Sequence, residues 1–135
     1  MPKNLNEVQR FMGTENLASF ATVGSDGEPH VVPVFFTYEN QRVYVQTDRK
    51  SVKVRNLQKN NKVAVAVYRG EEAVILRGKA RIIEDHEEFT KRTQDHIAKY
   101  RLKLDKNGKD SMGIPLFDKT IRCVVEVTSK RIIFW

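Results

Sequence analysis

Four cationic side chains lie within seven residues in the segment 47–56, and they are the strongest candidates for chemistry in this sequence. They are Arg49, Lys50, Lys53 and Arg55. A strand pattern gives way here to a helix pattern, with Ser51 as the candidate N-cap. The first turn of a helix offers free backbone N–H groups and the positive end of the helix dipole, so it binds phosphate readily. The Ser51 hydroxyl, Lys53 and Arg55 could add direct contacts to such a phosphate.

The same cations could instead form a solvated basic face of a helix. Helices usually carry acidic residues in the first turn and basic residues in the last turn. The first turn of this predicted helix is basic, which costs stability unless an anion is bound. This reversal favours an anion site, although the spacing leaves both interpretations open.

Other reactive side chains form no recognisable site. The histidines His30, His86 and His96 share no metal-ligand spacing, and Cys123 is the single cysteine. We interpret His86 and His96 as solvent-exposed and Cys123 as an inert buried thiol. The acidic residues within 85–88 are typical of helix caps. The sequence therefore predicts no metal site, and it identifies no catalytic acid or base.

The composition predicts one soluble domain over residues 1–135. Hydrophobic residues make up 40% and charged residues 30%, as in folded soluble proteins. The 24 basic and 17 acidic side chains give a net charge of +7, which favours anionic partners. No apolar run approaches the roughly 18 residues that cross a membrane, and residues 1–10 contain no apolar signal core. We therefore expect a reduced, cytoplasmic protein with no membrane partner.

The hydrophobic pattern predicts about seven strands and three helices. The helices begin near Asn4, Ser51 and Asp85, each a capping residue, and the first is expected to stop at Gly13. The strands are expected over 17–23, 30–38, 42–47, 62–68, 73–83, 120–128 and 131–135. Pro33 cannot donate to a ladder and must lie at an edge or a bulge, whereas Gly78 indicates a bulge or a close backbone approach. The segment 103–119 is expected to be a mobile loop.

Short turns join most consecutive strands, so the strands should pair antiparallel. The sequence lacks the alternation of strands and helices that a doubly wound sheet requires. The predicted fold class is therefore mainly β, a six- to seven-stranded antiparallel barrel, closed or split, with flanking helices.

Three stretches of the sequence resemble a known family. Residues 17–34 (LASFATVGSDGEPHVVPV) are similar to the opening hairpin of the pyridoxamine-phosphate-oxidase-like flavin-binding split barrels. Residues 51–57 (SVKVRNL), followed by 60–63 (NNKV), resemble that family's phosphate-binding strand-to-helix junction. Residues 74–81 (VILRGKAR) resemble the long strand that follows. The order and spacing of the three stretches carry the resemblance.

The resemblance implies a split-barrel homodimer that binds FMN, or in some branches a deazaflavin coenzyme, in two clefts at the dimer interface. The residues implied to hold the phosphate are Lys50, Ser51, Lys53 and Arg55. Those implied to lie beside the ribityl chain or the ring are Gln46 and Thr47. Those whose backbone would line the isoalloxazine ring are Val32, Pro33 and Val34. Asn56 would hold the junction in shape.

Trp135 is the last residue and the only tryptophan. A terminal aromatic side chain is seldom left exposed unless something covers it. We consider two roles for it: stacking on or beside a flavin in the partner's cleft, or anchoring the core or the dimer contact. Both roles predict that removing residues 132–135 damages the dimer.

Three functions remain open at this stage. The first is a flavin-dependent oxidoreductase acting on a small molecule, in which the cofactor carries the redox chemistry. The second is a non-catalytic flavin or haem-related carrier. The third is a small nucleic-acid-binding β-barrel, which we favour least because the cations gather at one helix start and do not alternate with aromatic residues along a sheet.

Overall fold

The structure is a computed structural model that describes residues 4–135. The predictions that include residues 1–3, namely the extent of the domain and the lack of an apolar signal core, lie outside the described residues at those positions. The described elements, in chain order, are α1 (Leu5–Thr14), β1 (Ala18–Val23), β2 (Pro29–Val34), β3 (Thr37–Glu39), β4 (Arg42–Asp48), α2 (Val52–Lys59), β5 (Lys62–Arg69), β6 (Glu72–Ile82), α3 (His86–Tyr100) and β7 (Arg122–Phe134). No helix within 4–135 is both long and apolar enough to span a membrane.

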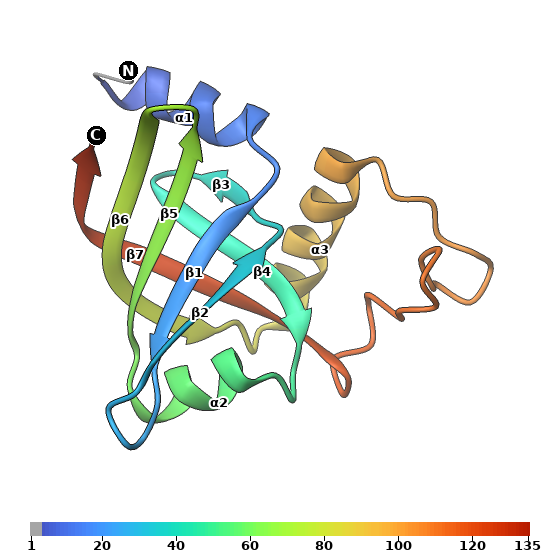
Figure 1. Ribbon diagram of the computed structural model, residues 1–135. Coiled ribbons are helices and arrows are strands. Elements are labelled where there is room, and N and C mark those ends of the chain that lie inside the picture. The colour runs from blue at the N-terminus through green and yellow to red at the C-terminus, as the bar shows by residue number, and fades with distance from the viewer. Residues whose placement is uncertain (1–3) are drawn as a thin grey trace.

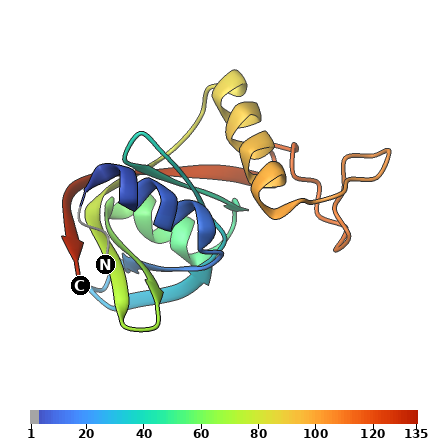
Figure 2. The same cartoon turned by 90° about the horizontal axis from the view of Figure 1, so that it is seen from above.

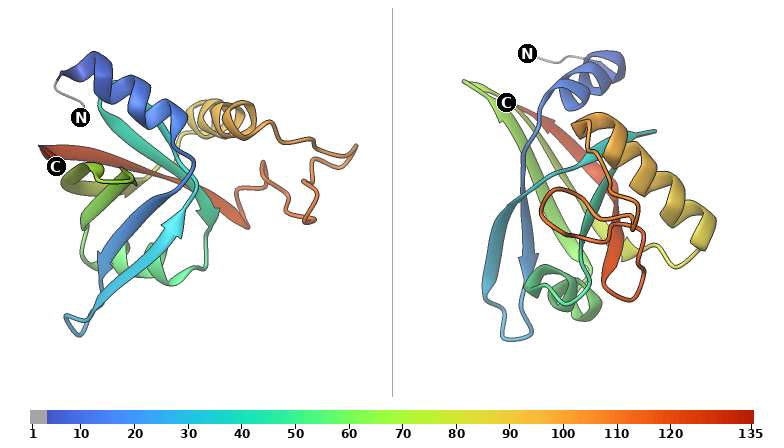
Figure 3. Two further views of the ribbon diagram at one scale, coloured as in Figure 1. Left: turned by 45° about the horizontal axis from the view of Figure 1, so that its top comes forward. Right: turned by 90° about the vertical axis from the view of Figure 1, so that its right-hand side faces the viewer.

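The seven strands form one antiparallel sheet in the order β2-β1-β5-β6-β7-β4-β3. The sheet curls into an open half-barrel, which Figures 1 and 3 show from several sides. Only Phe35 and Phe36 separate β2 from β3, yet these strands are the two edges of the sheet. A link this short holds the two edges within about 11 Å of each other. The predicted split barrel is thereby confirmed, and its split lies between β2 and the β4–β3 edge.

The interior of the barrel is filled by side chains that alternate along the strands. Val43 and Val45 of β4 point inward, whereas Tyr44 lies in a separate cluster on the outer side. Helices α1 and α2 cover opposite ends of the barrel (Figures 1 and 2), and their apolar faces join the same core. The predicted alternation and the amphipathic character of both helices are therefore confirmed.

Helix α3 packs on the outside of the sheet, where Phe89 meets Ile83, Tyr44 and Val124. Asp85 caps it by accepting from the Glu88 backbone N–H at 2.9 Å, as predicted. Asn4 caps α1 by accepting from the Glu7 backbone N–H at the same distance. Both helix starts were predictable because a capping box involves only residues that are close in the sequence.

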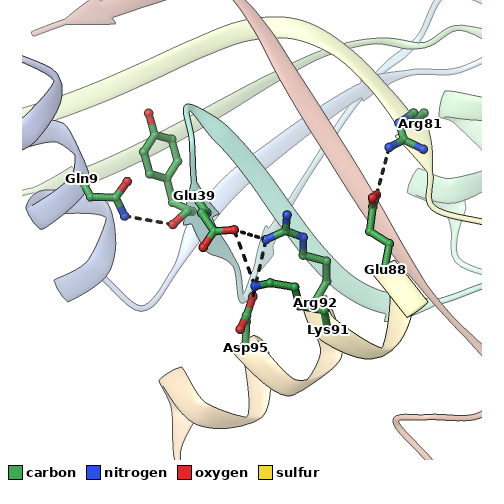
Figure 4. A network of polar contacts seen from close by, with 8 residues as sticks. Gln9, Glu39, Arg81, Glu88, Lys91, Arg92 and Asp95 are labelled. Carbon is green, nitrogen blue, oxygen red and sulfur yellow. Dashed lines mark hydrogen bonds and ion pairs between the residues drawn. The ribbon is translucent and has the colours of Figure 1, made fainter. Parts of the chain in front are cut away.

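Ion pairs fix the orientation of α3 against the sheet (Figure 4). Arg92 and Lys91 converge on Glu39 of β3, with the Arg92 Nη1 to Glu39 Oε1 distance at 2.6 Å. Glu88 pairs with Arg81 of β6 at 3.0 Å. Ion pairs that water reaches contribute little to stability, and Glu39, Lys91, Glu88 and Arg81 are all at least partly exposed. We therefore assign the anchoring of α3 mainly to the apolar cluster and its angle to these pairs.

Three predicted boundaries were wrong. Helix α1 continues through Gly13 to Thr14. The predicted strand 30–38 is two strands, because the chain leaves one edge of the sheet after Val34 and joins the other edge at Thr37. The predicted strands 120–128 and 131–135 are one strand, β7, because the long β6 pairs with both halves across a bulge.

The expected irregularity at Gly78 is confirmed. The β6–β7 register shifts between Arg77 and Gly78. A Cβ atom at Gly78 would collide with the backbone carbonyl of Thr128. A glycine is therefore required here by the close approach of the two strands.

Gly78→Ala is expected to lower the free energy of unfolding by about 1–3 kcal/mol, because the added methyl group must push two paired strands apart. Chemical denaturation measures the change. Gly13→Ala is the matched control: its Cβ meets nothing within 4 Å, and its helical position predicts a gain of about 0.5–1 kcal/mol. Equal effects of the two substitutions would contradict this account.

Candidate functional site

A groove of about 400 Å³ lies along the split, between β2 and β4. Its lining residues are Leu17, Pro33, Val34, Phe35, Val45, Gln46, Thr47, Lys53, Ile114 and Arg122. The volume falls within the range of small-molecule sites, about 300–1,000 Å³. Five of the predicted site residues meet here, and they are Pro33, Val34, Gln46, Thr47 and Lys53.

The groove has backbone edges on both sides. Strand β2 pairs with β1 on one side only and is an edge strand, as predicted for Pro33. Strand β3 pairs with β4 only over 42–44. On the side that faces the groove, residues 45–48 of β4 therefore pair with no strand within 4–135, and their backbone edge is open. Edge backbone groups can donate to and accept from a bound ligand.

The link between β2 and β3 is held rigidly by the end of α3. The Tyr100 hydroxyl accepts from the Phe36 N–H at 2.9 Å and lies 2.8 Å from the Asn16 carbonyl oxygen. The Lys99 ammonium donates to the carbonyl oxygens of Met12 and Phe36. The Phe35 ring packs edge-on against the Tyr100 ring, with centroids 4.9 Å apart. These contacts connect the rim of the groove at Phe35 and Phe36 to the end of α3.

Two partly buried cations face each other in the groove. Burial lowers the pKa of the Lys53 ammonium, and the neighbouring charge of Arg122 lowers it further. Burial also lowers the pKa of the Arg122 guanidinium. No ion pair within 4.0 Å joins either cation to a carboxylate among residues 4–135. An anion in the groove would relieve the repulsion between these two charges.

Arg122 is held by Gln46 and not by an acid. Its Nε and Nη2 atoms donate to Gln46 Oε1 at 3.0 and 2.8 Å. The Gln46 amide in turn donates to the Leu116 carbonyl oxygen at 2.6 Å. Arg49 is not among the residues lining the groove, and it donates to the Lys119 carbonyl oxygen at 2.7 Å. The segment 46–49 is therefore connected to the loop 103–119 through two side chains.

Turns organise the backbone of this loop. The Asp105 carboxylate accepts from the backbone N–H groups of Asn107 and Lys109. The Asp110 carboxylate accepts from those of Met112 and Ile114. The predicted mobility of the segment stays a prediction.

The start of α2 carries an unsatisfied polar group. Ser51 is the N-cap residue, yet its side chain makes no capping hydrogen bond. Its Oγ atom is buried and has no hydrogen-bond partner. A buried hydroxyl without a partner is costly, and the first turn of α2 contains no acidic residue. A phosphate oxygen would satisfy the hydroxyl and the free N–H groups of the helix together.

Ser51 and the remaining predicted residues are not among those lining the groove. Lys50 and Arg55 are exposed on the surface beside it. Val32 packs against the core from β2. Asn56 donates to the Thr22 hydroxyl at 3.0 Å and so ties α2 to β1. Trp135 is 68% exposed. The binding roles of these residues stay predictions.

Three of the groove residues could not be identified from the amino-acid order alone. Arg122 and Ile114 follow Gln46 by about 70 residues, and only the curl of the sheet brings them together. Phe35 belongs to an apolar run that predicted a continuous strand. It is instead 54% exposed at the rim of the groove.

The prediction for His96 was wrong, whereas those for His86 and Cys123 are confirmed. His86 is exposed and Cys123 is buried. His96 is only 7% exposed, and its Nδ1 atom has no hydrogen-bond partner. The helical pattern misplaced it because its surroundings include residues distant in the sequence, among them Arg122 of β7 and Asp110 of the segment 103–119. Residues 4–135 contain no group of three His, Cys, Asp or Glu side chains placed to hold a metal ion.

The burial of His96 leads us to predict that the folded protein loses stability in acid. Burial lowers the pKa of His96 from 6.5 to about 4, and the charges of Arg122 and Lys99 act in the same direction. The unfolded chain therefore binds a proton between pH 6.5 and 4 that the folded chain does not. The stability is fully present above pH 6.5 and falls as the pH drops to 4, by up to about 3 kcal/mol. His96→Leu should flatten this part of the profile measured by denaturant unfolding, and parallel profiles would contradict the assignment.

The curled antiparallel sheet with its open edge defines a pyridoxamine-phosphate-oxidase-like split barrel. The pyridoxamine 5'-phosphate oxidase family pattern matches residues 5–134, and the chain belongs to that family. The resemblance on which the sequence prediction rested is thereby confirmed.

Solved structures share this fold over nearly the whole chain. The conserved hypothetical protein Rv2991 from Mycobacterium tuberculosis has a TM-score of 0.82 at 22% identity, covering 100% of this chain and 86% of that one. An F420 reductase has a TM-score of 0.74 at 18% identity, covering 98% of each chain. Among sequences, a 5a,11a-dehydrotetracycline/5a,11a-dehydrooxytetracycline reductase of Streptomyces rimosus is 38% identical over 71 residues. That match spans 50% of this chain and 49% of the relative.

Proposed function

We propose that the protein is an oxidoreductase that binds FMN or a deazaflavin coenzyme in the groove along the split. The observation that carries the proposal is the pair of groove cations, Lys53 and Arg122, which form no ion pair with a carboxylate in the described chain. The helix start that carries Lys53 also holds the buried, unpartnered Ser51 hydroxyl. The family, the similarity to a reductase and the fold shared with an F420 reductase support it.

The residues that would hold the phosphate are Ser51, Lys53 and the N–H groups of the first turn of α2. Arg122 adds a second cation beside Lys53, and the exposed Lys50 and Arg55 would raise the local positive potential. Gln46 and Thr47 would lie along the ribityl chain. The backbone edge of 32–34 would line the ring. The cofactor itself supplies the electron or hydride transfer, so no side-chain acid or base is required for that step.

The site would be completed by a second copy of the chain. Large apolar side chains stand exposed on the molecule, including Val31, Tyr68, Phe134 and Trp135. Tyr68 and Trp135 flank Ala73 on the two neighbouring strands, so they adjoin on one face, and an exposed apolar patch is typical of an interaction surface. The backbone of Trp135 pairs with Ala73 at the start of β6, which holds the side chain at the surface for a partner.

Trp135→Ala is expected to weaken dimer formation by about 30-fold or more, the effect of losing an interface hot spot. Sedimentation at several protein concentrations measures it. An accompanying loss of FMN affinity would support stacking on the flavin, whereas unchanged affinity would support an anchor. Removal of 132–135 should have a larger effect, because Ile132 also packs against the core. An unchanged mass distribution in both variants would contradict an interface at Trp135.

Cofactor identification by mass spectrometry on gently purified protein tests the proposal most directly, together with titration of the cofactor-free chain with FMN and with a deazaflavin. Bound FMN or deazaflavin supports it. Haem recovered in place of flavin would favour the carrier alternative, and tight oligonucleotide binding that weakens steeply with salt would favour the nucleic-acid alternative. A folded protein that binds neither flavin nor deazaflavin would refute the proposal.

A further inference from the structure

His96 is a buried titratable side chain that is not among the residues lining the groove. It is 7% exposed, and its Nδ1 atom has no hydrogen-bond partner among residues 4–135. Its ring packs against that of Tyr100, with the two centroids 5.1 Å apart. A buried imidazole in this setting is tolerated while it is neutral, whereas a charged one needs an anion or an acceptor close by.

Three charged side chains act on this imidazole, and each belongs to a different element. Arg122 lies in β7, Lys99 lies in α3, and Asp110 lies in the segment 103–119. The two cations oppose a positive charge on His96, whereas the Asp110 carboxylate favours one. A proton on His96 would therefore repel two of these neighbours and attract the third.

The two cations are bonded to opposite walls of the groove. Arg122 lines the groove and donates twice to Gln46 of β4, at 3.0 and 2.8 Å. Lys99 donates at 3.0 Å to the carbonyl oxygen of Phe36, which follows Phe35 at the other rim. Repulsion between these cations and a charged His96 would therefore act on both walls at once.

The carboxylate that acts on His96 holds a third part of the groove wall. The Asp110 carboxylate accepts from the backbone N–H of Ile114 at 3.0 Å, and Ile114 lines the groove. A charged imidazole would compete for this carboxylate, because a hydrogen bond between two charged groups is stronger than one to a neutral N–H. His96 is thus connected to three parts of the groove through its charged neighbours.

We propose that His96 is a proton-sensitive positioning residue: neutral His96 lets the groove keep its shape, and protonated His96 loosens the groove so that it releases a bound anion. The proposal rests on the proposed function only for the identity of that anion, which we take to be FMN. Proton uptake and ligand release are then linked, so each weakens as the other is prevented.

The expected pH range follows from the two forms of the groove. Burial and the two cations lower the pKa of His96 from 6.5 to about 4 while the groove is closed. In an opened groove the side chain would take up its proton near the ordinary value. The apparent midpoint of the transition should therefore lie between these two values.

An NMR titration of the cofactor-free protein in this range tests the loosening. We expect the amide resonances of Phe36 and Ile114 to shift with the same midpoint as the His96 ring, while the amides of the central strand β5 stay protected from exchange. In His96→Leu both groove amides should keep their neutral-pH positions. His86→Gln is the matched control, because His86 is exposed at the start of α3, and it should behave like the wild type.

The proposal is overturned if the groove amides do not follow His96. It is also overturned if β5 loses protection at the same pH as the groove changes, since His96 would then contribute only to global acid unfolding. Groove amides that shift equally in His96→Leu would assign the change to another titrating group and have the same consequence.

FMN affinity measured from about pH 7 to about pH 5 tests the release. The phosphate of FMN itself takes up a proton at about pH 6, so the readout is the difference between variants. The wild type and His86→Gln should lose about three- to tenfold more affinity over this range than His96→Leu. An equal loss in His96→Leu, or a smaller loss in the wild type, overturns the proposal, and the second result would mean that a charged His96 attracts the anion directly. If FMN does not bind at pH 7, the proposed function fails, and the NMR titration alone decides the role of His96.

Discussion

Replacing Lys53 with methionine is expected to weaken FMN binding by about 10- to 150-fold, the cost of losing one charged contact to the phosphate. The same substitution should make the cofactor-free protein more stable. Lys53 is partly buried beside Arg122, and burial and that charge both lower the pKa of its ammonium group. An apolar side chain of similar length removes this unfavourable charge. Isothermal titration and chemical denaturation measure the two effects.

Lys50→Met is the matched control for Lys53, because Lys50 is exposed beside the groove and does not line it. It should weaken FMN binding less, and the effect should fade as the salt concentration rises. Opposite signs for affinity and stability are typical of residues kept for function. If Lys53→Met lowered the stability of the free protein and left FMN binding intact, Lys53 would be a structural residue.

Replacing Arg122 with methionine is expected to weaken FMN binding about tenfold or more and, unlike the change at Lys53, to destabilise the free protein. Arg122 donates twice to Gln46 Oε1, at 3.0 and 2.8 Å. Its loss leaves that buried oxygen unsatisfied, which costs about 1–3 kcal/mol. FMN titration and denaturant unfolding measure both effects.

A double variant tests whether Arg122 acts on the cofactor only by keeping the fold intact. Adding Gln46→Leu to Arg122→Met removes the unsatisfied oxygen, so stability should recover in part whereas FMN affinity should not. Arg122→Lys keeps the positive charge but loses the bidentate hydrogen bonding of the guanidinium. It should therefore retain more FMN affinity than Arg122→Met. If affinity returned together with stability in the double variant, Arg122 would act on the cofactor only by keeping the fold intact.

The predictions that succeeded for the fold depend on local physics. The capping boxes at Asn4 and Asp85 involve residues three positions apart, and both form as expected. The alternation along 42–47 places Val43 and Val45 in the core. The failures, at 30–38 and at 120–135, lie where the chain passes from one sheet edge to the other or crosses a bulge. Such features depend on neighbouring strands, which a local pattern does not contain.

The candidate site likewise contains residues that a local sequence pattern indicates and residues that it does not. The helix start that carries Ser51 and Lys53 was predictable because a basic, polar run is visible over a few residues, and of these two residues Lys53 lines the groove. Arg122 was not, because nothing near it in the sequence indicates that its guanidinium meets Gln46, 76 residues earlier. His96 was misplaced for a related reason, since Arg122 and Asp110, which lie near it, come from distant parts of the sequence.

The amino-acid order by itself determined the strand-rich class, the helix starts and the cationic junction, because periodicity, capping and helix dipoles act over a few residues. Tertiary structure decided that the two sheet edges come together beside that junction, since only the curl of all seven strands brings β2 next to β4. It also decided which cations are left without carboxylate partners, because pairing depends on neighbours in space. The groove along the split and the charged neighbours of His96 are both consequences of that packing.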